Sequence, residues 1–139
     1  MRLLLCVAAP LLLGATDMGA PIEVVVTGVR SGDGMVRVAI CSQQQFMGDC
    51  TWSASAAAKA GVVSVVVRNV PPGRYAAQAF HDADNDDKLG RNWIGLPREG
   101  IGFSNDAMPR LFPPRFAKAA FDHGRDPQRV EVKVRYFLG

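Results

Sequence analysis

The stretch QRVEVKVRYF, residues 128–137, decides the fold class of this chain. Its apolar and charged side chains alternate without a break: Val130, Val132, Val134 and Tyr136 against Glu131, Lys133 and Arg135. A period of two places the two sets on opposite faces of an extended strand. The stretch therefore predicts a half-buried antiparallel strand that has one face in water.

Four earlier segments are also typical of β-strands, because they are rich in β-branched residues and end at turn residues. PIEVVVTGVR (21–30) and MVRVAIC (35–41) are predicted to make a hairpin around SGDG, and GVVSVVVRNV (61–70) and RYAAQAFHD (74–82) follow one another around PPG. The segment TWSASAAAKA (51–60) is open to two interpretations, a short helix or a loose crossover. Without a long helical pattern, the chain is predicted to be all-β, a small antiparallel β-sandwich.

No periodicity persists over residues 81–116, where Gly, Pro, Asn and Asp are frequent. Structureless segments of this length are uncommon inside domains. The segment is nevertheless apolar enough to pack on itself, with Trp93, Ile94, Leu96, Ile101, Phe103, Leu111, Phe112 and Phe116. We therefore expect one long ordered loop that is packed by its own side chains.

Residues 1–20 predict a secretory signal peptide, since Arg2 is followed by an apolar run and then by small residues. Cleavage after Ala15 or after Ala20 fits, and a retained N-terminal anchor is the alternative. Residues 21–139 would then be a single periplasmic or secreted β-sandwich domain, with no transmembrane segment after cleavage. The formal net charge is +3 and the basic residues are scattered, so no nucleic-acid partner is predicted.

Cleavage would leave two cysteines, Cys41 and Cys50, at the ends of CSQQQFMGDC. Exported proteins meet an oxidising compartment, where two such cysteines pair. A redox-active or metal-binding thiol pair is the alternative, but the spacing is not C-x-x-C and no histidine is near. The sequence favours a structural disulfide.

Four motifs in the second half of the chain form a longer pattern: PPGRY (71–75), FHD (80–82), GLPREGIGFSN (95–105) and PPRF (113–116). With the final alternating strand, they resemble an exported bacterial family catalogued as domain of unknown function 2141. The resemblance covers about residues 22–136. It implies a small extracytoplasmic β-sandwich, in the style of transthyretin-like or immunoglobulin-like domains. It implies no activity, since none is attached to the family.

The acidic segment HDADNDDKLG (81–90) departs from the family pattern. Asp84 and Asp86 stand where asparagines are usual, Asn85 and Asp87 replace glycines, and Gly90 replaces an aspartate. Asp residues at alternate positions of a loop supply the oxygen ligands that Ca²⁺ prefers. The metal candidates are Asp82, Asp84, Asp86 and Asp87.

The loop is not an EF-hand, because Asp87 stands at the position of the obligatory glycine and Trp93 at that of the bidentate glutamate. Two interpretations stay open. One is a looser calcium site completed by Asn92, Glu99 or backbone carbonyls. The other is a solvated acidic turn, in which Asp and Asn hydrogen-bond their own backbone.

The remaining candidates could form a ligand-facing rim: His81, Asn92, Glu99, Ser104 and Asn105. Ser104 and Asn105 are equally suited to cap backbone groups and clasp the long loop. We expect a non-enzymatic binding or structural module whose partner is an unknown envelope ligand or protein, with calcium as a candidate cofactor. The alternative function is a hydrolase that uses His81 with Asp82 or Glu99.

Overall fold

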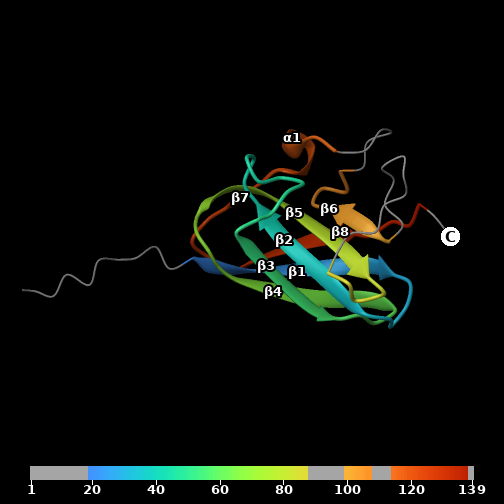
Figure 1. The fold of residues 1–139 in the computed structure, drawn as a ribbon. Helices are drawn as coiled ribbons and strands as arrows, with labels where there is room; N and C mark the ends of the chain where they lie inside the picture. The colour runs from blue at the N-terminus through green and yellow to red at the C-terminus, as the bar shows by residue number, and fades with distance from the viewer. Residues whose placement is uncertain (1–18, 88–98, 108–113, 138–139) are drawn as a thin grey trace, which may run out of the picture.

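The structure, a computed structural model, describes residues 19–87, 99–107 and 114–137. Two β-sheets pack face to face (Figure 1). The first has the strand order β4-β1-β8 and the second β3-β2-β5-β6, with β7 paired to the start of β5. The elements are β1 (Ala20–Val29), β2 (Met35–Cys41), β3 (Trp52–Ala57), β4 (Gly61–Val70), β5 (Gly73–Asp82), β6 (Ile101–Phe103), α1 (Phe116–Ala119), β7 (Phe121–His123) and β8 (Gln128–Lys133). This confirms the predicted all-β sandwich.

The core between the sheets is built almost entirely from valine and isoleucine. Alternate residues of β1 and β2 point inward and are buried: Ile22, Val24, Val26, Val36, Val38 and Ile40. Each such side chain stabilises the fold by about 1.5–3 kcal/mol relative to leaving it in water. The predicted hairpin of residues 21–30 and 35–41 is wrong, because β1 pairs with β4 and β8 in the first sheet, whereas β2 pairs with β3 and β5 in the second. The turn at SGDG carries the chain from one sheet to the other.

The terminal strand buries the predicted face, since Val132 and Val134 lie in the core and Lys133 is exposed. Its predicted antiparallel pairing is wrong: β8 runs parallel to β1, from Ile22 opposite Gln128 to Thr27 opposite Lys133. The alternation of side chains fixes which face is buried but not the direction of the neighbour. The direction follows from the crossing of the chain between sheets after β7, which no local signal encodes.

The segment that could have been a helix or a crossover is the edge strand β3. It pairs antiparallel with β2, from Met35 opposite Ala57 to Ile40 opposite Trp52. The Trp52 ring packs edge-on against Tyr75, with ring centroids 5.4 Å apart. The alternation of side chains along β3 was hard to see in the sequence, because serine and alanine differ so little in size that their alternation gives a weak signal.

The long segment after β5 is more regular than predicted where the structure describes it. The expectation of an unbroken loop over 81–116 is wrong in part, because Ile101–Phe103 forms β6 and pairs with β5. A second apolar cluster orders this region, in which the Phe46 ring lies edge-on to both Phe103 and Phe116 at 5.7 Å. Of the apolar residues expected to pack the loop, five lie outside the described residues: Trp93, Ile94, Leu96, Leu111 and Phe112.

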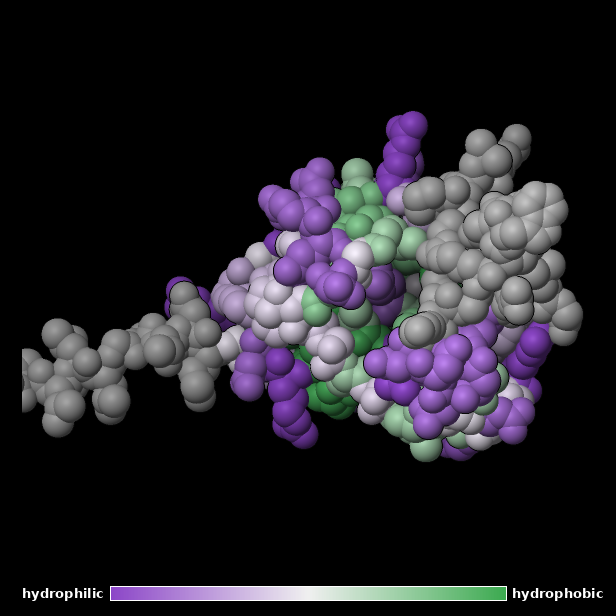
Figure 2. Space-filling model, viewed as in Figure 1, coloured by the Kyte–Doolittle hydropathy of each residue, from purple (hydrophilic) through white to green (hydrophobic). Residues whose placement is uncertain are grey.

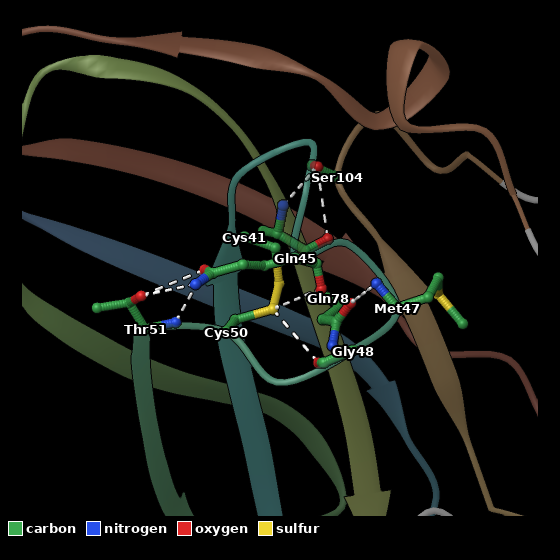
Figure 3. Close-up of a disulfide and its surroundings, with 9 residues drawn as sticks. Cys41, Gln45, Met47, Gly48, Cys50, Thr51, Gln78 and Ser104 are labelled. Carbon is green, nitrogen blue, oxygen red and sulfur yellow. Dashed lines mark hydrogen bonds between the residues drawn. A yellow bond between two sulfur atoms is a disulfide. The ribbon is translucent and has the colours of Figure 1, made fainter.

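The predicted disulfide between Cys41 and Cys50 is present, with the Cα atoms 5.0 Å apart (Figure 3). It ties the loop between β2 and β3 onto the second sheet. The Gln45 side chain holds the end of the loop, because its Oε1 accepts the Thr51 N–H at 3.1 Å. Gln78 Oε1 accepts the Met47 N–H at 3.4 Å, so the loop also rests on β5.

The predicted signal peptide lies almost wholly outside the described residues, which begin at Gly19. The helix α1 is far too short to cross a bilayer, and the described parts of the chain contain no other candidate for a membrane-spanning helix.

Candidate metal centre

The acidic turn begins at Asp82, the last residue of β5, whose side chain is fully buried. One carboxylate oxygen of Asp82 accepts the Asp86 N–H at 3.1 Å and the other accepts the Asp87 N–H at 3.0 Å. The side chain thereby folds the chain after it into a tight turn. Asn85 and Asp87 have φ values of 53° and 60°. This left-handed backbone explains why glycine suits both positions and why Asn and Asp are tolerated there.

Four carboxylates meet at this turn. One oxygen from each of Asp82, Asp84, Asp86 and Glu99 lies within 4.8 Å of the others. Calcium binds oxygen at 2.3–2.6 Å, so oxygens on opposite sides of the ion are separated by about 5 Å. The spacing of the group therefore fits one Ca²⁺ ion. Three of the predicted aspartates belong to it, together with Glu99, which the sequence offered as a completing ligand.

One of the predicted ligands, Asp87, is not in this group. Asp87 is 81% exposed and points to Arg37, with its Oδ1 3.3 Å from Arg37 Nε. Asn92 lies outside the described residues. The described part of the group therefore offers four carboxylates, and further ligands would be backbone carbonyls or water.

Glu99 is the unusual member of the group. Its Oε2 atom is buried and has no hydrogen-bond partner among the described residues. Burial, the hydrogen bond to Asp84 and the negative charges of Asp84, Asp82 and Asp86 together raise the pKa of Glu99 to about 7. At neutral pH, this carboxyl group is therefore divided between a protonated form and an anion that needs a positive partner.

Arg37 compensates the charge of Asp82 and was missed as a site residue by the sequence reasoning. Its Nε donates to Asp82 Oδ2 at 2.6 Å, and its Nη2 donates to Asn85 Oδ1 at 2.8 Å. Burial raises the pKa of Asp82, but the bonds from Arg37, Asp87 and Asp86 outweigh it and hold the pKa below its ordinary value. The one sequence signal was a single arginine between the inward-facing valines of β2.

His81 is fully buried under the turn, and both of its ring nitrogens are bonded. Nε2 lies 2.7 Å from the Asp33 carbonyl oxygen, which only accepts, so Nε2 carries the proton. Nδ1 then accepts from the Tyr136 hydroxyl at 2.8 Å. The basic nitrogen that a hydrolase would need is thus held by Tyr136. The same ring lines a cavity of about 380 Å³ that Glu99 and Arg30 also line.

Ser104 and Asn105 lie against α1 instead of the carboxylate group. The buried Ser104 hydroxyl accepts the Ala77 N–H at 2.9 Å and donates to the Ala119 carbonyl. Asn105 Nδ2 donates to the carbonyl oxygens on either side of that residue, those of Lys118 and Ala120, at 3.2 and 2.9 Å. These bonds favour the clasp over the ligand-facing rim.

A family model described as "Uncharacterized protein conserved in bacteria (DUF2141)" matches residues 24–131. The chain belongs to the DUF2141 family. The match extends from β1 into β8 and includes Arg37, the acidic turn and Glu99, so the resemblance read from the motifs is confirmed. No curated protein and no solved structure matches this DUF2141 chain. Its function has to be argued from its own residues.

Proposed function

We propose that this protein is an exported, non-enzymatic binding module whose acidic turn is fixed by a calcium ion. The observation that carries the proposal is the convergence of four carboxylates, one of which has a buried oxygen without a partner in the described residues. The unidentified ligand would be an envelope component or protein that meets the loops of this rigid scaffold.

A bare solvated turn accounts for this arrangement less well than a bound cation does. Asp84 and Asp86 are exposed and need no cation by themselves, because exposed like charges repel weakly in water. Glu99, however, comes from a separate segment next to β6 and is brought half-buried against them. At an effective dielectric constant near 20, each like-charge pair about 4 Å apart costs roughly 4 kcal/mol, which a divalent cation would reverse.

Calcium fits the ligand chemistry better than magnesium or zinc. All four ligands are carboxylate oxygens, and the nearest histidine uses both ring nitrogens elsewhere. Zinc sites in proteins rely on cysteine and histidine. Magnesium is usually held by one or two carboxylates and several waters, whereas calcium accepts six to eight oxygens in flexible geometry.

Export is supported by two independent features. The Cys41–Cys50 disulfide requires an oxidising compartment in most bacteria. The sequence of residues 1–20 has the three-part layout of a signal peptide. We therefore place the protein in the periplasm or outside the cell.

The cavity beside His81 supports a second candidate function, a hydrolase that uses His81 with Glu99. His81 would act as a base only after Tyr136 released its Nδ1 atom. A Tyr136→Phe variant removes that bond. The parent protein, Tyr136→Phe and His81→Gln are assayed with ester and glycoside reporter substrates. Hydrolysis that rises in Tyr136→Phe and disappears in His81→Gln would establish the enzyme. Inactivity of all three proteins would exclude it.

The test of calcium binding uses residues 21–139, titrated with calcium in a calorimeter and melted with calcium or chelator. Ligand at 100 times its Kd stabilises the native state by about 2.7 kcal/mol, so the melting temperature should rise with calcium. Glu99→Gln and Asp84→Asn should weaken binding, whereas Asp126→Asn, an exposed acid outside the group, should not. Identical melts with and without calcium, and no heat of binding, would remove the proposal.

A further inference from the structure

The outer face of the second sheet is hollowed between the disulfide loop and the acidic turn. Two rows of side chains cross this face over β3, β2 and β5: Ser55, Arg37 and Phe80 in one row, and Ser53, Ala39 and Gln78 in the other. Small residues occupy the outer edge of both rows, Ser55 and Ser53, and the middle of the second row, Ala39. They leave a groove of about 330 Å³, which Asp49 and Asp87 also line.

Both ends of the groove are held in place. At one end, the Cys41–Cys50 disulfide, drawn with Gly48 in Figure 3, fixes Cys50. Gly48 and Asp49 line the groove beside it. At the other end, the backbone N–H of Asp87 is bonded to the buried Asp82 carboxylate. A groove whose walls are fixed in this way loses little conformational entropy when a ligand enters, which favours binding.

The lining combines donors, acceptors and aromatic surface. Ser53 and Ser55 both donate and accept, Asp49 accepts, and Gln78 offers an amide group. Phe80 adds a partly exposed aromatic ring beside them. Figure 2, which views the molecule from this side, shows hydrophilic and hydrophobic residues next to one another near the middle of the surface. This mixture matches a molecule that has hydroxyl groups on its edges and apolar C–H faces.

The charges around the groove exclude other ligand classes. Among the described residues that line the groove, two are acidic, Asp49 and Asp87, and one is basic, Arg37, which is already bonded to Asp82, so phosphates and other anions are disfavoured. Asp87 is itself paired with Arg37 at 3.3 Å, which leaves one carboxylate to attract a basic peptide. The volume lies at the lower end of the range for small-molecule sites, about 300–1,000 Å³, and accommodates one or two sugar rings.

We propose that this groove binds a neutral saccharide. The inference goes beyond the proposed function and does not depend on calcium, because none of the four carboxylates of the calcium group lines the groove. It gives the scaffold a ligand class that is abundant on and around bacterial cells.

The proposal is tested by NMR titration of residues 21–139 in chelator with soluble tetrasaccharides of glucose, N-acetylglucosamine and mannose. Each is added to about 10 mM, which detects a Kd near 1 mM. At least one should shift the amide signals of Ser53, Ala39 and Ser55. Use of chelator keeps the outcome independent of calcium binding, which is measured separately.

A pair of matched variants locates the site. Ser53→Tyr fills the groove and should weaken binding at least tenfold, with an unchanged melting temperature. Ser64→Tyr makes the same change at an exposed position of β4, the edge strand of the other sheet, and should bind like the parent protein. The inference is overturned if none of the sugars shifts these signals or if both variants bind the sugar equally well. It is also overturned if a tetralysine peptide, titrated in the same way, is the only one of these probes that binds in the groove.

Discussion

Replacement of Arg37 by glutamine should make the fold depend on calcium. The change removes the only positive charge that contacts Asp82 in the described structure, at 2.6 Å. The Asp82 side chain is 0% exposed, so water cannot take the place of the guanidinium group. A calcium ion at the four-carboxylate group would supply the missing positive charge.

The expected loss follows from the burial of the pair. Removal of one partner of a buried ion pair costs about 3–5 kcal/mol. Asp82 keeps its two bonds from the Asp86 and Asp87 N–H groups, and the Arg37 side chain is 24% exposed, so the lower end of this range applies. At about 4 °C per kcal/mol for a domain of this size, a loss of about 3 kcal/mol lowers the melting temperature by about 12 °C.

The assay is calorimetric melting of the parent and variant proteins in chelator and in calcium. Arg129→Gln is the matched control, because it breaks an ion pair of similar length, 2.7 Å between Arg129 Nε and Glu23 Oε1. That pair lies on the surface, where the two side chains are 75% and 34% exposed. Such a pair contributes about 0–1 kcal/mol. Calcium should restore more stability to Arg37→Gln than to the parent. Equal losses for the two variants in chelator would refute the role of Arg37 as the counter-ion of Asp82.

Substitutions at Glu99, at the Cys41–Cys50 disulfide and at Ser104 are expected to change calcium affinity or stability. Because the pKa of Glu99 is raised to about 7, calcium has to displace a proton below that pH, so affinity should be about tenfold weaker at pH 6 than at pH 8 by calorimetry. The calcium-free protein should lose stability as pH rises from 4.5 to 7, because in this range the unfolded state has released the Glu99 proton and the folded state still holds it. Glu99→Gln should flatten the pH dependence of both calcium affinity and stability. Replacement of Cys41 and Cys50 by alanine should lower the free energy of unfolding by about 2–3 kcal/mol in urea melts, and an unchanged midpoint would contradict the role of the disulfide. Ser104→Ala should cost about 1–3 kcal/mol, because the buried Ala77 N–H loses its partner, and a neutral result would show that the clasp is dispensable.

The sequence predicts the parts of the fold that depend on local signals. The strands around SGDG and PPG are strongly marked by β-branched residues and by Gly and Pro, and they form where expected. The parallel pairing of β8 and the strand character of β3 were not predictable. The first depends on the path of the chain between sheets, and the second depends on Trp52 packing against Tyr75 from another strand.

The candidate site was predictable to a similar degree. The alternate spacing of Asp82, Asp84 and Asp86 is a local pattern, and these residues do converge. Arg37 was missed because its contact with Asp82 depends on the register between β2 and β5, which places Met35 opposite Asp82. Sequence spacing alone carries no information on that register.

The parallel pair of β1 and β8 has a consequence for the order of folding. β1 lies between β4 and β8, so one of its backbone edges finds a partner only when residues 128–133 are available. The first strand made is thus completed by the last, and the closing contact spans almost the entire domain, which is a slow step in β-proteins. A chain shortened before residue 128 would present β1 as an exposed apolar edge, the form of a strand most prone to aggregate.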